Sequence, residues 1–339
     1  MTITQELILA ARDAVGEGDS ATDWKIVPTE HAVLLADKSA SFAEVLRGAR
    51  PKGIAKMYVE LDALAVEARD TFKNTVTRAN FAVFCTAGLG ALLLIASGIQ
   101  GTLGKFGLWV VGTIGLLGVV SGSLATMWLT QVKGGSLVNK WSKERAKAEA
   151  KRLAYFKAVI NGVSDDPFDQ LLAFEYTRRF LLDNQIDYFR DRGRQHERAH
   201  NSALKTSTQA VFVASTVTAG AGLLSMLAPQ LATIAGIGVI ASAYSTLALS
   251  RSSVNIDRRN ADRYRLAKDQ LEERKLEIDI YREKVASGDK GAVQEFFEPI
   301  FITLSTDHKV FLNFVEQREM AIGAMEGRLT VATDALQES

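Results

Sequence analysis

Hydrophobic and charged positions are segregated along this chain. Residues 79–104, 106–132 and 206–250 contain no Asp, Glu, Lys or Arg. Each run is long enough to cross the ~30 Å hydrocarbon core of a bilayer as a helix. The third is too long for one crossing, and Ala228-Pro229-Gln230 supplies its turn because proline cannot continue a helix. The pattern predicts four transmembrane helices in two hairpins, over residues 80–100, 107–131, 207–228 and 231–250.

The charged remainder of the chain has helical periodicity. Residues 55–78 lead into the first span, and a second long helix is expected to run from residue 168 into the third. After the fourth span, apolar residues recur at a spacing typical of a coiled-coil seam: Tyr264, Ala267, Leu271, Ile278 and Tyr281. Residues 16–50 fit either one short strand or a loop and a helix. The predicted fold class is all-α, a polytopic membrane protein with a cytoplasmic helical domain.

A weak internal repeat indicates the domain organisation. Arg145 and Glu149 follow the first hairpin as Arg265 and Asp269 follow the second, at an offset of 120 residues. We expect two units, each made of a helix, a two-span hairpin and a helix. The proposed divisions are an N-terminal cytoplasmic region of uncertain fold over 1–54, the first unit over 55–162, the second unit with C-terminal cytoplasmic helices over 163–330, and a tail over 331–339.

Basic residues predict the orientation of the spans. Lys105 is the one basic residue in the two hairpin turns, whereas many Lys and Arg residues lie near the other span ends. Because positive charge stays in the cytoplasm, both chain termini are expected there. The net charge of +1 gives no overall polycation for nucleic acid, and a single cysteine excludes an intrachain disulfide.

One motif has the form of a catalytic metal site. His196, Glu197 and His200 form H-E-x-x-H, the zinc motif of metallopeptidases. Arg198 interrupts the apolar face that such a helix needs, and a solvated helix carrying two histidines is the simpler interpretation. We find no catalytic constellation and predict no enzyme activity, no bound metal and no cofactor.

Small and hydroxyl residues are patterned within the predicted spans. Small residues let helices approach closely in lipid, and the helix-packing candidates are Gly118, Gly122, Gly220 and Gly222. Hydroxyl residues fall on single faces that either line a water path or bond to helix carbonyls. The pore-lining candidates are Ser123, Thr126, Thr130, Ser215, Thr218, Ser225, Ser242 and Ser245.

Basic clusters flank the second hairpin on its predicted cytoplasmic side. One interpretation is anchoring against anionic lipid. The other is a collar that binds an anionic ligand such as a nucleotide or oligonucleotide. The ligand-binding candidates are Arg194, Arg198, Arg259 and Arg263.

Several of these segments resemble a known bacterial family. Trp141, Arg145, Ala148 and Glu149 form a W-x-x-x-R-x-x-A-E pattern after the first hairpin. This resembles the SLATT superfamily, the SMODS and SLOG-associating two-transmembrane effector domains. Residues 175–327 are similar to a second unit, with Arg179, Gln185 and Tyr188 before the third span and FLNFVEQREMAIG near the end. Ala261 stands where this second unit would need tryptophan.

The resemblance implies an effector of bacterial antiphage defence in the inner membrane. Such proteins are thought to form ion channels or pores, controlled by a nucleotide-type signal from a neighbouring nucleotide-synthesising enzyme. Because four packed helices leave no lumen, conduction would need a homo-oligomer, and we favour a tetramer. The alternatives are a non-conducting scaffold anchored in the lipid bilayer, and a zinc peptidase that uses the H-E-x-x-H motif.

Overall fold

The computed structural model describes residues 3–18, 23–134, 137–226, 228 and 233–337, and every regular element in these ranges is helical. The prediction of an all-α chain is therefore confirmed for the described residues. The elements are α1 (Ile3–Val15), α2 (Pro28–Leu35), α3 (Ala40–Arg47), α4 (Ala49–Gly134), α5 (Leu137–Ile160), α6 (Pro167–Thr177), the π-helix η1 (Arg178–Asp183), α7 (Asn184–Ser225), α8 (Ala235–Asn255), α9 (Asp257–Lys275), α10 (Ile278–Ala286), α11 (Ala292–Asn313) and α12 (Val315–Gln337).

Three described helical segments are long and apolar enough to cross a membrane, namely Ala49–Gly101, Gly104–Ile160 and Pro167–Ser225. They contain the first two predicted spans and residues 207–225 of the third. The fourth predicted span corresponds to α8, but its first residues lie outside the described ranges. The sequence prediction of membrane helices is thus confirmed in its coarser form, by length and composition.

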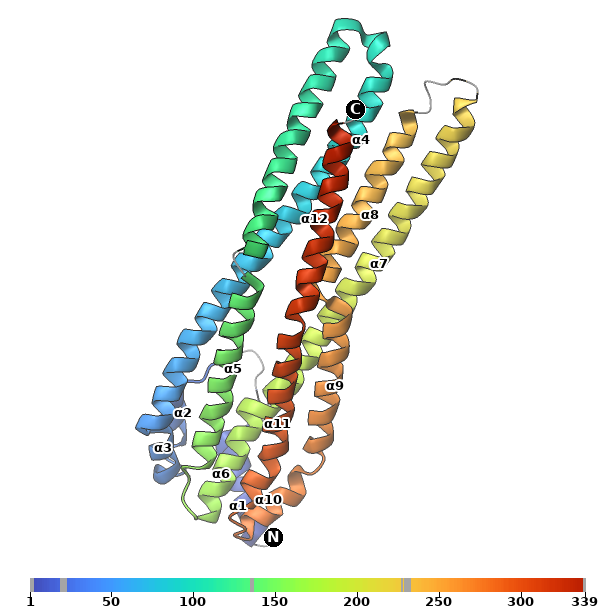
Figure 1. Ribbon diagram of the computed structural model, residues 1–339. Coiled ribbons are helices and arrows are strands. Elements are labelled where there is room, and N and C mark those ends of the chain that lie inside the picture. Colours follow the sequence, from blue (N-terminus) through green and yellow to red (C-terminus); the bar gives the residue numbers. More distant parts are fainter. Residues whose placement is uncertain (1–2, 19–22, 135–136, 227, 229–232, 338–339) are drawn as a thin grey trace. The chain divides into compact units, whose positions relative to one another are not determined.

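The turn of the first hairpin is a single backbone reversal inside α4. Gly104 has φ 57° and ψ −136°, so the chain leaves helical geometry there and turns back (Figure 1). A positive φ of this kind costs glycine little because it has no Cβ. The predicted turn over residues 98–105 contains this glycine.

The long helix expected from residue 168 is present, with one unforeseen feature. Residues 167–225 are helical throughout, but six of them form the π-helix η1. The wider π turn is rare and is often found at functional sites. Gly193 lies inside α7 and does not interrupt the helix. An idealised Cβ at Gly193 would lie 3.6 Å from the Cβ atom of Tyr264.

The chain packs into two compact units that interleave in sequence. Unit 1 holds Met1–Glu67, Ser142–Gln195 and Arg259–Asn313, and unit 2 holds Ala68–Trp141, His196–Arg258 and Phe314–Ser339. This division follows packing and not the internal repeat, so the proposed pair of helix–hairpin–helix units stays a prediction.

Unit 1 is a helical domain built around α6. Every residue of α6 from Asp169 to Thr177 is buried, which is typical of a helix surrounded by others. Aromatic side chains fill the space around it: Phe42, Tyr155, Phe156, Phe174, Phe296 and Phe297. Residues 16–50, which the sequence left open between strand and helix, include the short helices α2 and α3.

The predicted coiled-coil seam lies in the core of unit 1. Its five apolar residues are all buried, but the helix is interrupted after Lys275, where α9 ends. Arg274, which breaks the apolar pattern, donates to the carbonyl oxygens of Phe296 at 3.1 Å and Glu295 at 3.0 Å. The two carbonyl groups thus satisfy the hydrogen-bond donors of the partly buried Arg274 guanidinium in place of water.

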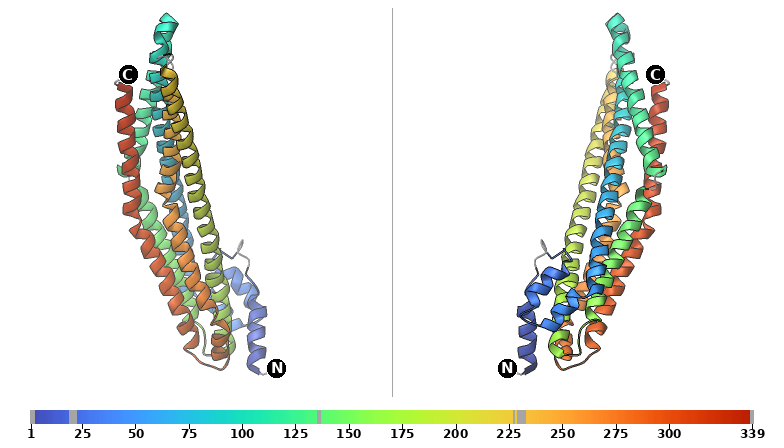
Figure 2. Two further views of the ribbon diagram at one scale, coloured as in Figure 1. Left: turned by 90° about the vertical axis from the view of Figure 1, so that its right-hand side faces the viewer. Right: turned by 90° about the vertical axis from the view of Figure 1, so that its left-hand side faces the viewer.

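Unit 2 combines the apolar hairpins with the C-terminal helix α12. Both side views place α12 beside the α4 hairpin (Figure 2). Its residues Ile322, Met325 and Leu329 join a buried cluster with Phe72, Val76, Ala125 and Leu129 of α4. The sequence placed the C-terminal helices in the cytoplasmic domain and did not predict this packing against the spans.

The connection between α8 and α9 holds an unusual backbone conformation. Ile256 has φ 54° and ψ 43°, the left-handed helical region. A β-branched residue is rare there, and such strain costs roughly 1–3 kcal/mol. The amide N–H of Ile256 donates to the carbonyl of Ser253 at 3.1 Å, which ends α8. α8 and α9 are therefore two separate helices that meet at Ile256.

Candidate functional site

The hydroxyl residues of the second span lie on an open face of unit 2. Ser123, Thr126 and Thr130 are exposed, whereas Ala125 and Leu129 of the same helix are buried. Thr126 donates to the carbonyl of Gly122 at 3.0 Å. Nothing lies within 4 Å of an idealised Cβ at Gly112 or Gly115, which continue the same side of the helix. Among the described residues, none packs against this side of α4 at Gly112 or Gly115.

The hydroxyl residues of the second hairpin divide between packing and exposure. Ser245 is buried and forms a 2.6 Å hydrogen bond with Ser207 of α7. Ser225 donates to the carbonyl of Gly222 at 2.7 Å, and Ser215 is exposed. Thr218 is also exposed, and its hydroxyl faces Gly238 of α8. These residues therefore do not form one continuous polar face within the chain.

The predicted packing glycines differ in what they contact. An idealised Cβ at Gly122 would lie 3.3 Å from Thr333 Cγ2 of α12, and Gly118 is also buried. Gly220 and Gly222 have no neighbour within 4 Å of such a Cβ. The close approach of α7 and α8 instead occurs at Gly238, whose idealised Cβ would be 3.0 Å from the carbonyl oxygen of Ala214.

Polar contacts as well as apolar ones hold α12 in unit 2. Arg318 is 2% exposed and its guanidinium lies 5.0 Å from the centre of the Trp141 ring. Glu326 forms an ion pair with Lys133, and Arg328 donates to Ser250 Oγ of α8 at 2.5 Å. The apolar spacing of Ile322, Met325 and Leu329 was the signal in the sequence that α12 has a buried face.

A cavity of about 520 Å³ lies among α4, α8 and α12 within unit 2. Phe84, Ala91 and Leu94 of α4 face Val239 and Ala243 of α8 across it. Asn80, Ser250 and Arg328 contribute its polar groups, and Ser242, one of the predicted pore-lining residues, also lies in its wall. The sequence did not predict this cavity, because one of its walls is the C-terminal helix.

The ligand-binding candidates have unlike environments. Arg194 and Arg259 in unit 1 are exposed, as is Arg198 in unit 2. Arg263, by contrast, has a side chain that is 8% exposed and pairs with Asp307 at 3.1 Å. Its guanidinium also lies 4.4 Å from the centre of the Tyr264 ring. Arg263 is thus engaged inside unit 1, and only the other three arginines are presented at a surface.

The H-E-x-x-H histidines are not arranged around a common point with a third ligand. His196 Nδ1 lies 2.7 Å from Asp257 Oδ1, and no group of three or more His, Cys, Asp or Glu in the described ranges could hold a metal ion. Asp257 therefore gives His196 a structural partner at the start of α9.

Comparisons of the chain with family models, curated proteins and solved structures find no match. The similarity to the SLATT superfamily therefore depends on the quoted residues alone. In unit 1, Arg145 pairs with Glu149 and, at 3.0 Å, with Asp62. Arg265, the corresponding residue of the internal repeat, has a side chain that is 68% exposed and pairs with Asp262. The two matched positions thus have different environments.

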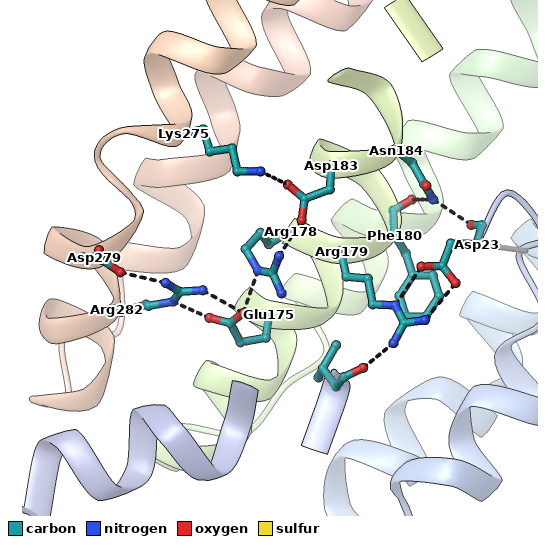
Figure 3. A network of polar contacts seen from close by, with 11 residues as sticks. Asp23, Glu175, Arg178, Arg179, Phe180, Asp183, Asn184, Lys275, Asp279 and Arg282 are labelled. Atoms are coloured by element: carbon teal, nitrogen blue, oxygen red, sulfur yellow. Dashed lines mark hydrogen bonds and ion pairs between the residues drawn. The ribbon is translucent and has the colours of Figure 1, made fainter. Parts of the chain in front are cut away.

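A buried charge network surrounds the π-helix in unit 1 (Figure 3). Glu175 has a fully buried side chain and accepts from Arg282 at 2.5 and 3.0 Å and from Arg178 at 2.6 Å. Arg178 also pairs with Asp183, and Asp279 pairs with Arg282 at 2.7 Å. Two guanidiniums thus share one buried carboxylate and have a further acidic partner each, which ties α10 to α6 and η1.

The neighbouring residue Arg179 secures the N-terminal segment to η1. Its guanidinium donates to both carboxylate oxygens of Asp23, at 2.7 and 2.9 Å, and to the carbonyl of Val15 (Figure 3). Asn184 donates to the carbonyl of Asp23 at 2.8 Å. Arg179 is one of the residues of the SLATT resemblance, and its contacts here are structural.

Two buried titratable groups in unit 1 have shifted pKa values. Burial lowers the pKa of His31 to about 4, with Asp23 opposing and Arg179 reinforcing the shift. His31 Nδ1 is 2.7 Å from the hydroxyl of Tyr176. Burial raises the pKa of Asp307 to about 6, although Arg263 opposes it. The interior of unit 1 therefore disfavours the charged forms of both the His31 imidazole and the Asp307 carboxyl group.

Proposed function

We propose that this chain is a bacterial membrane effector that forms a homo-oligomeric ion channel or pore, controlled by a nucleotide-type signal through its cytoplasmic helical domain. The observation that carries the proposal is the open side of α4 with Gly112, Gly115, Ser123, Thr126 and Thr130. A monomer in lipid gains nothing from a glycine and hydroxyl stripe that faces outward. Small and hydroxyl residues on such a face suit contact with another helix or with a water path.

The proposed topology has four spans with both termini in the cytoplasm of the bacterial inner membrane. Three apolar helical segments and the helix α8 support it. The uncharged runs and the concentration of Lys and Arg outside the hairpin turns favour this direction. Unit 1, which holds most of the charged segments, is then the cytoplasmic domain.

Conduction in this proposal comes from several chains around an axis. In unit 2 the core is filled by Phe72, Leu129, Met325 and their neighbours, so a single chain has no continuous lumen there. A closed ring of subunits, for which we favour a tetramer, would bring the open sides of α4 together. The resemblance to SLATT proteins is the basis for placing this channel in antiphage defence, beside a nucleotide-synthesising enzyme.

The signal is proposed to reach the two exposed candidate arginines of unit 1, Arg194 and Arg259. Guanidinium groups bind phosphates through paired charge-assisted hydrogen bonds. Both side chains are exposed and therefore accessible to a soluble anion. Arg263 is left out of this proposed set because Asp307 already pairs with it.

Membrane potential tests the function directly. Cells that express the chain with its neighbouring genes should depolarise on stimulation, and purified protein in liposomes should pass potassium. Gly112→Leu should reduce conduction by blocking the open side of α4, whereas Ala219→Leu, on an exposed face of α7, should not. Vesicles that stay sealed under every activating condition would contradict the channel. If the predicted transmembrane helices could be exchanged for unrelated ones without loss of activity, the chain would instead be an anchored scaffold.

A further inference from the structure

The unit 2 cavity has an apolar body and a polar end. Phe84, Ala87, Ala91 and Leu94 line it along α4, and Val239, Ala243 and Leu247 line it along α8. Its volume of about 520 Å³ lies in the ~300–1,000 Å³ range of sites that enclose an organic ligand. A space of this size with a mostly apolar wall favours an apolar occupant over ordered water.

The polar end is defined by three side chains from three helices. The side-chain amide of Asn80 in α4 donates a hydrogen bond to the carbonyl oxygen of Leu247 at 3.2 Å. Arg328 of α12 donates one Nη1–H to Ser250 Oγ. Among the described residues, no ion pair involves Arg328, and the nearest carboxylate in its own helix, Glu326, pairs with Lys133. One exposed guanidinium thus stands at the mouth of an apolar cavity with most of its donors available.

The direction of the cavity matches the proposed position of the bilayer. Asn80 and Ser250 are next to the charged ends of their spans, marked by Arg78 and Arg251. Leu94 lies fourteen residues further along α4 than Asn80, or about 21 Å at 1.5 Å per residue. The polar end is therefore at the level of the cytoplasmic headgroups, and the apolar body extends into the hydrocarbon region.

We infer that this cavity binds an anionic phospholipid of the cytoplasmic leaflet. One acyl chain occupies the apolar body between α4 and α8, and the headgroup phosphate lies against the free guanidinium donors of Arg328. Basic pockets between spans on the cytoplasmic side are suited to anionic headgroups, and a guanidinium binds phosphate through parallel N–H donors. A zwitterionic lipid presents the same chain but adds a cationic group beside Arg328, so it binds more weakly.

The bound lipid would also hold α12 in place. Ala324, Gly327 and Val331 form the α12 wall of the cavity, so an acyl chain contacts all three helices at once. This contact adds to the apolar contacts that Ile322, Met325 and Leu329 of α12 already make with α4. The inference depends on the membrane placement proposed above but not on conduction, so a failed channel assay leaves it unaffected.

Two substitutions separate the headgroup contact from the chain contact. Arg328→Gln removes the charge and keeps an amide near Ser250, whereas Ala243→Leu fills the apolar body from α8. Arg251→Gln is the control for the first, since Arg251 is exposed at the same end of α8 and does not line the cavity. Ala219→Leu is the control for the second, on an exposed face of α7.

The experiment is native mass spectrometry of the full-length protein after exchange into nanodiscs that contain equal amounts of phosphatidylglycerol and phosphatidylcholine. The wild type should retain phosphatidylglycerol in preference to phosphatidylcholine. Arg328→Gln should reduce this preference about tenfold. Ala243→Leu should lower retention of both lipids, and the two control variants should match the wild type.

Three results would overturn the inference. They are equal retention of the two lipids by the wild type, a phosphatidylglycerol preference unchanged in Arg328→Gln, and an equal loss of preference in Arg251→Gln, which would mean non-specific surface attraction. A wild-type protein that does not enter nanodiscs at all would instead contradict the proposed membrane placement, so the two failures can be told apart.

Discussion

Gly122 of α4 and Thr333 of α12 meet so closely that an added methyl group at Gly122 would stand 3.3 Å from Thr333 Cγ2. Thr86 lies on the other side of the same point, 3.7 Å away from that methyl position. The absence of a side chain at Gly122 therefore lets the C-terminal helix pack closely against the helical hairpin of α4. A glycine that the sequence marked for helix packing has this role, with α12 as its partner.

Gly122→Leu should loosen α12 from unit 2. A leucine there overlaps Thr333, and overpacking of this kind costs ~1–3 kcal/mol. Arg318 and Arg328 of α12 should then be cleaved several-fold faster by trypsin, because Arg318 is buried in the native packing. The measurement is the cleavage rate in detergent, followed by mass spectrometry of the fragments.

Gly112→Leu is the matched control for this change. Gly112 lies on the same helix, but nothing stands within 4 Å of an idealised Cβ there. Trypsin should cleave its α12 at the wild-type rate, whereas the oligomer should be smaller if the open side of α4 is a subunit contact. Equal cleavage rates for Gly122→Leu and the wild type would mean that α12 does not depend on this contact.

Glu175→Gln should destabilise unit 1 strongly. The carboxylate is fully buried between Arg178 and Arg282, and its loss leaves two guanidiniums with one acidic partner each. Breaking a buried ion pair costs ~3–5 kcal/mol. The thermal unfolding midpoint, followed by circular dichroism, should fall by many degrees.

An exposed ion pair in the same unit provides the comparison for Glu175. Lys290 and Asp165 are 2.5 Å apart with side chains 67% and 69% exposed. Asp165→Asn should change stability by less than ~1 kcal/mol, because water and salt screen such pairs. Similar midpoints for the two variants would show that the network around η1 contributes little to stability.

The long apolar helices could be predicted from sequence because a helix suited to lipid excludes charge over its whole length. The runs free of Asp, Glu, Lys and Arg, and the turn that includes Gly104, need no knowledge of tertiary contacts. The position of α12 could not be predicted in this way. Its apolar face consists of Ile322, Met325 and Leu329 between charged residues, and such a face does not reveal which helix it will meet.

Whether a candidate site residue is exposed or paired depends on partners that are distant in the sequence. Arg259 and Arg263 have the same local pattern, but Asp307, 44 residues after Arg263, takes only one of them into an ion pair. Ser245 likewise bonds to Ser207 on another helix, whereas Ser123 stays exposed. The cavity was also invisible, because its walls come from three helices that are distant along the chain.

His31 should make stability depend on pH. Its pKa is lowered to about 4 in the folded chain from 6.5, so between these pH values the unfolded chain binds a proton that the folded chain excludes. Stability from this group is therefore complete above pH 6.5 and is lost as the pH falls toward 4. The loss amounts to about 2 kcal/mol between pH 7 and pH 5.

His31→Gln removes this titration and keeps a polar side chain near Tyr176. At pH 8 the variant should be less stable than the wild type, since it loses the ring stacked on Phe180 at 4.3 Å. The difference in thermal midpoint should shrink as the pH falls from 7 to 5. His308→Gln should show the same sign, because burial lowers the pKa of His308 too. A difference that stays constant with pH would mean that His31 accepts its proton in the folded chain.

Arg263→Gln should lower stability, whereas Arg259→Gln should weaken binding of the signal and leave stability unchanged. Arg263 is 8% exposed and paired with Asp307, so its loss leaves a buried carboxylate whose pKa is already about 6 and removes the cation that opposes that rise. We expect Arg263→Gln to cost about 3 kcal/mol at pH 7, with a lower unfolding midpoint.

Arg259 is exposed, and a surface change of this type shifts stability by less than ~0.5 kcal/mol. If Arg259 contacts a nucleotide phosphate, Arg259→Gln should weaken the binding of a fluorescent nucleotide about tenfold while the midpoint stays unchanged. Titration of the nucleotide against both variants, with the midpoint measured on the same samples, checks the two roles together. Identical binding curves for Arg259→Gln and the wild type would remove Arg259 from the proposed signal site.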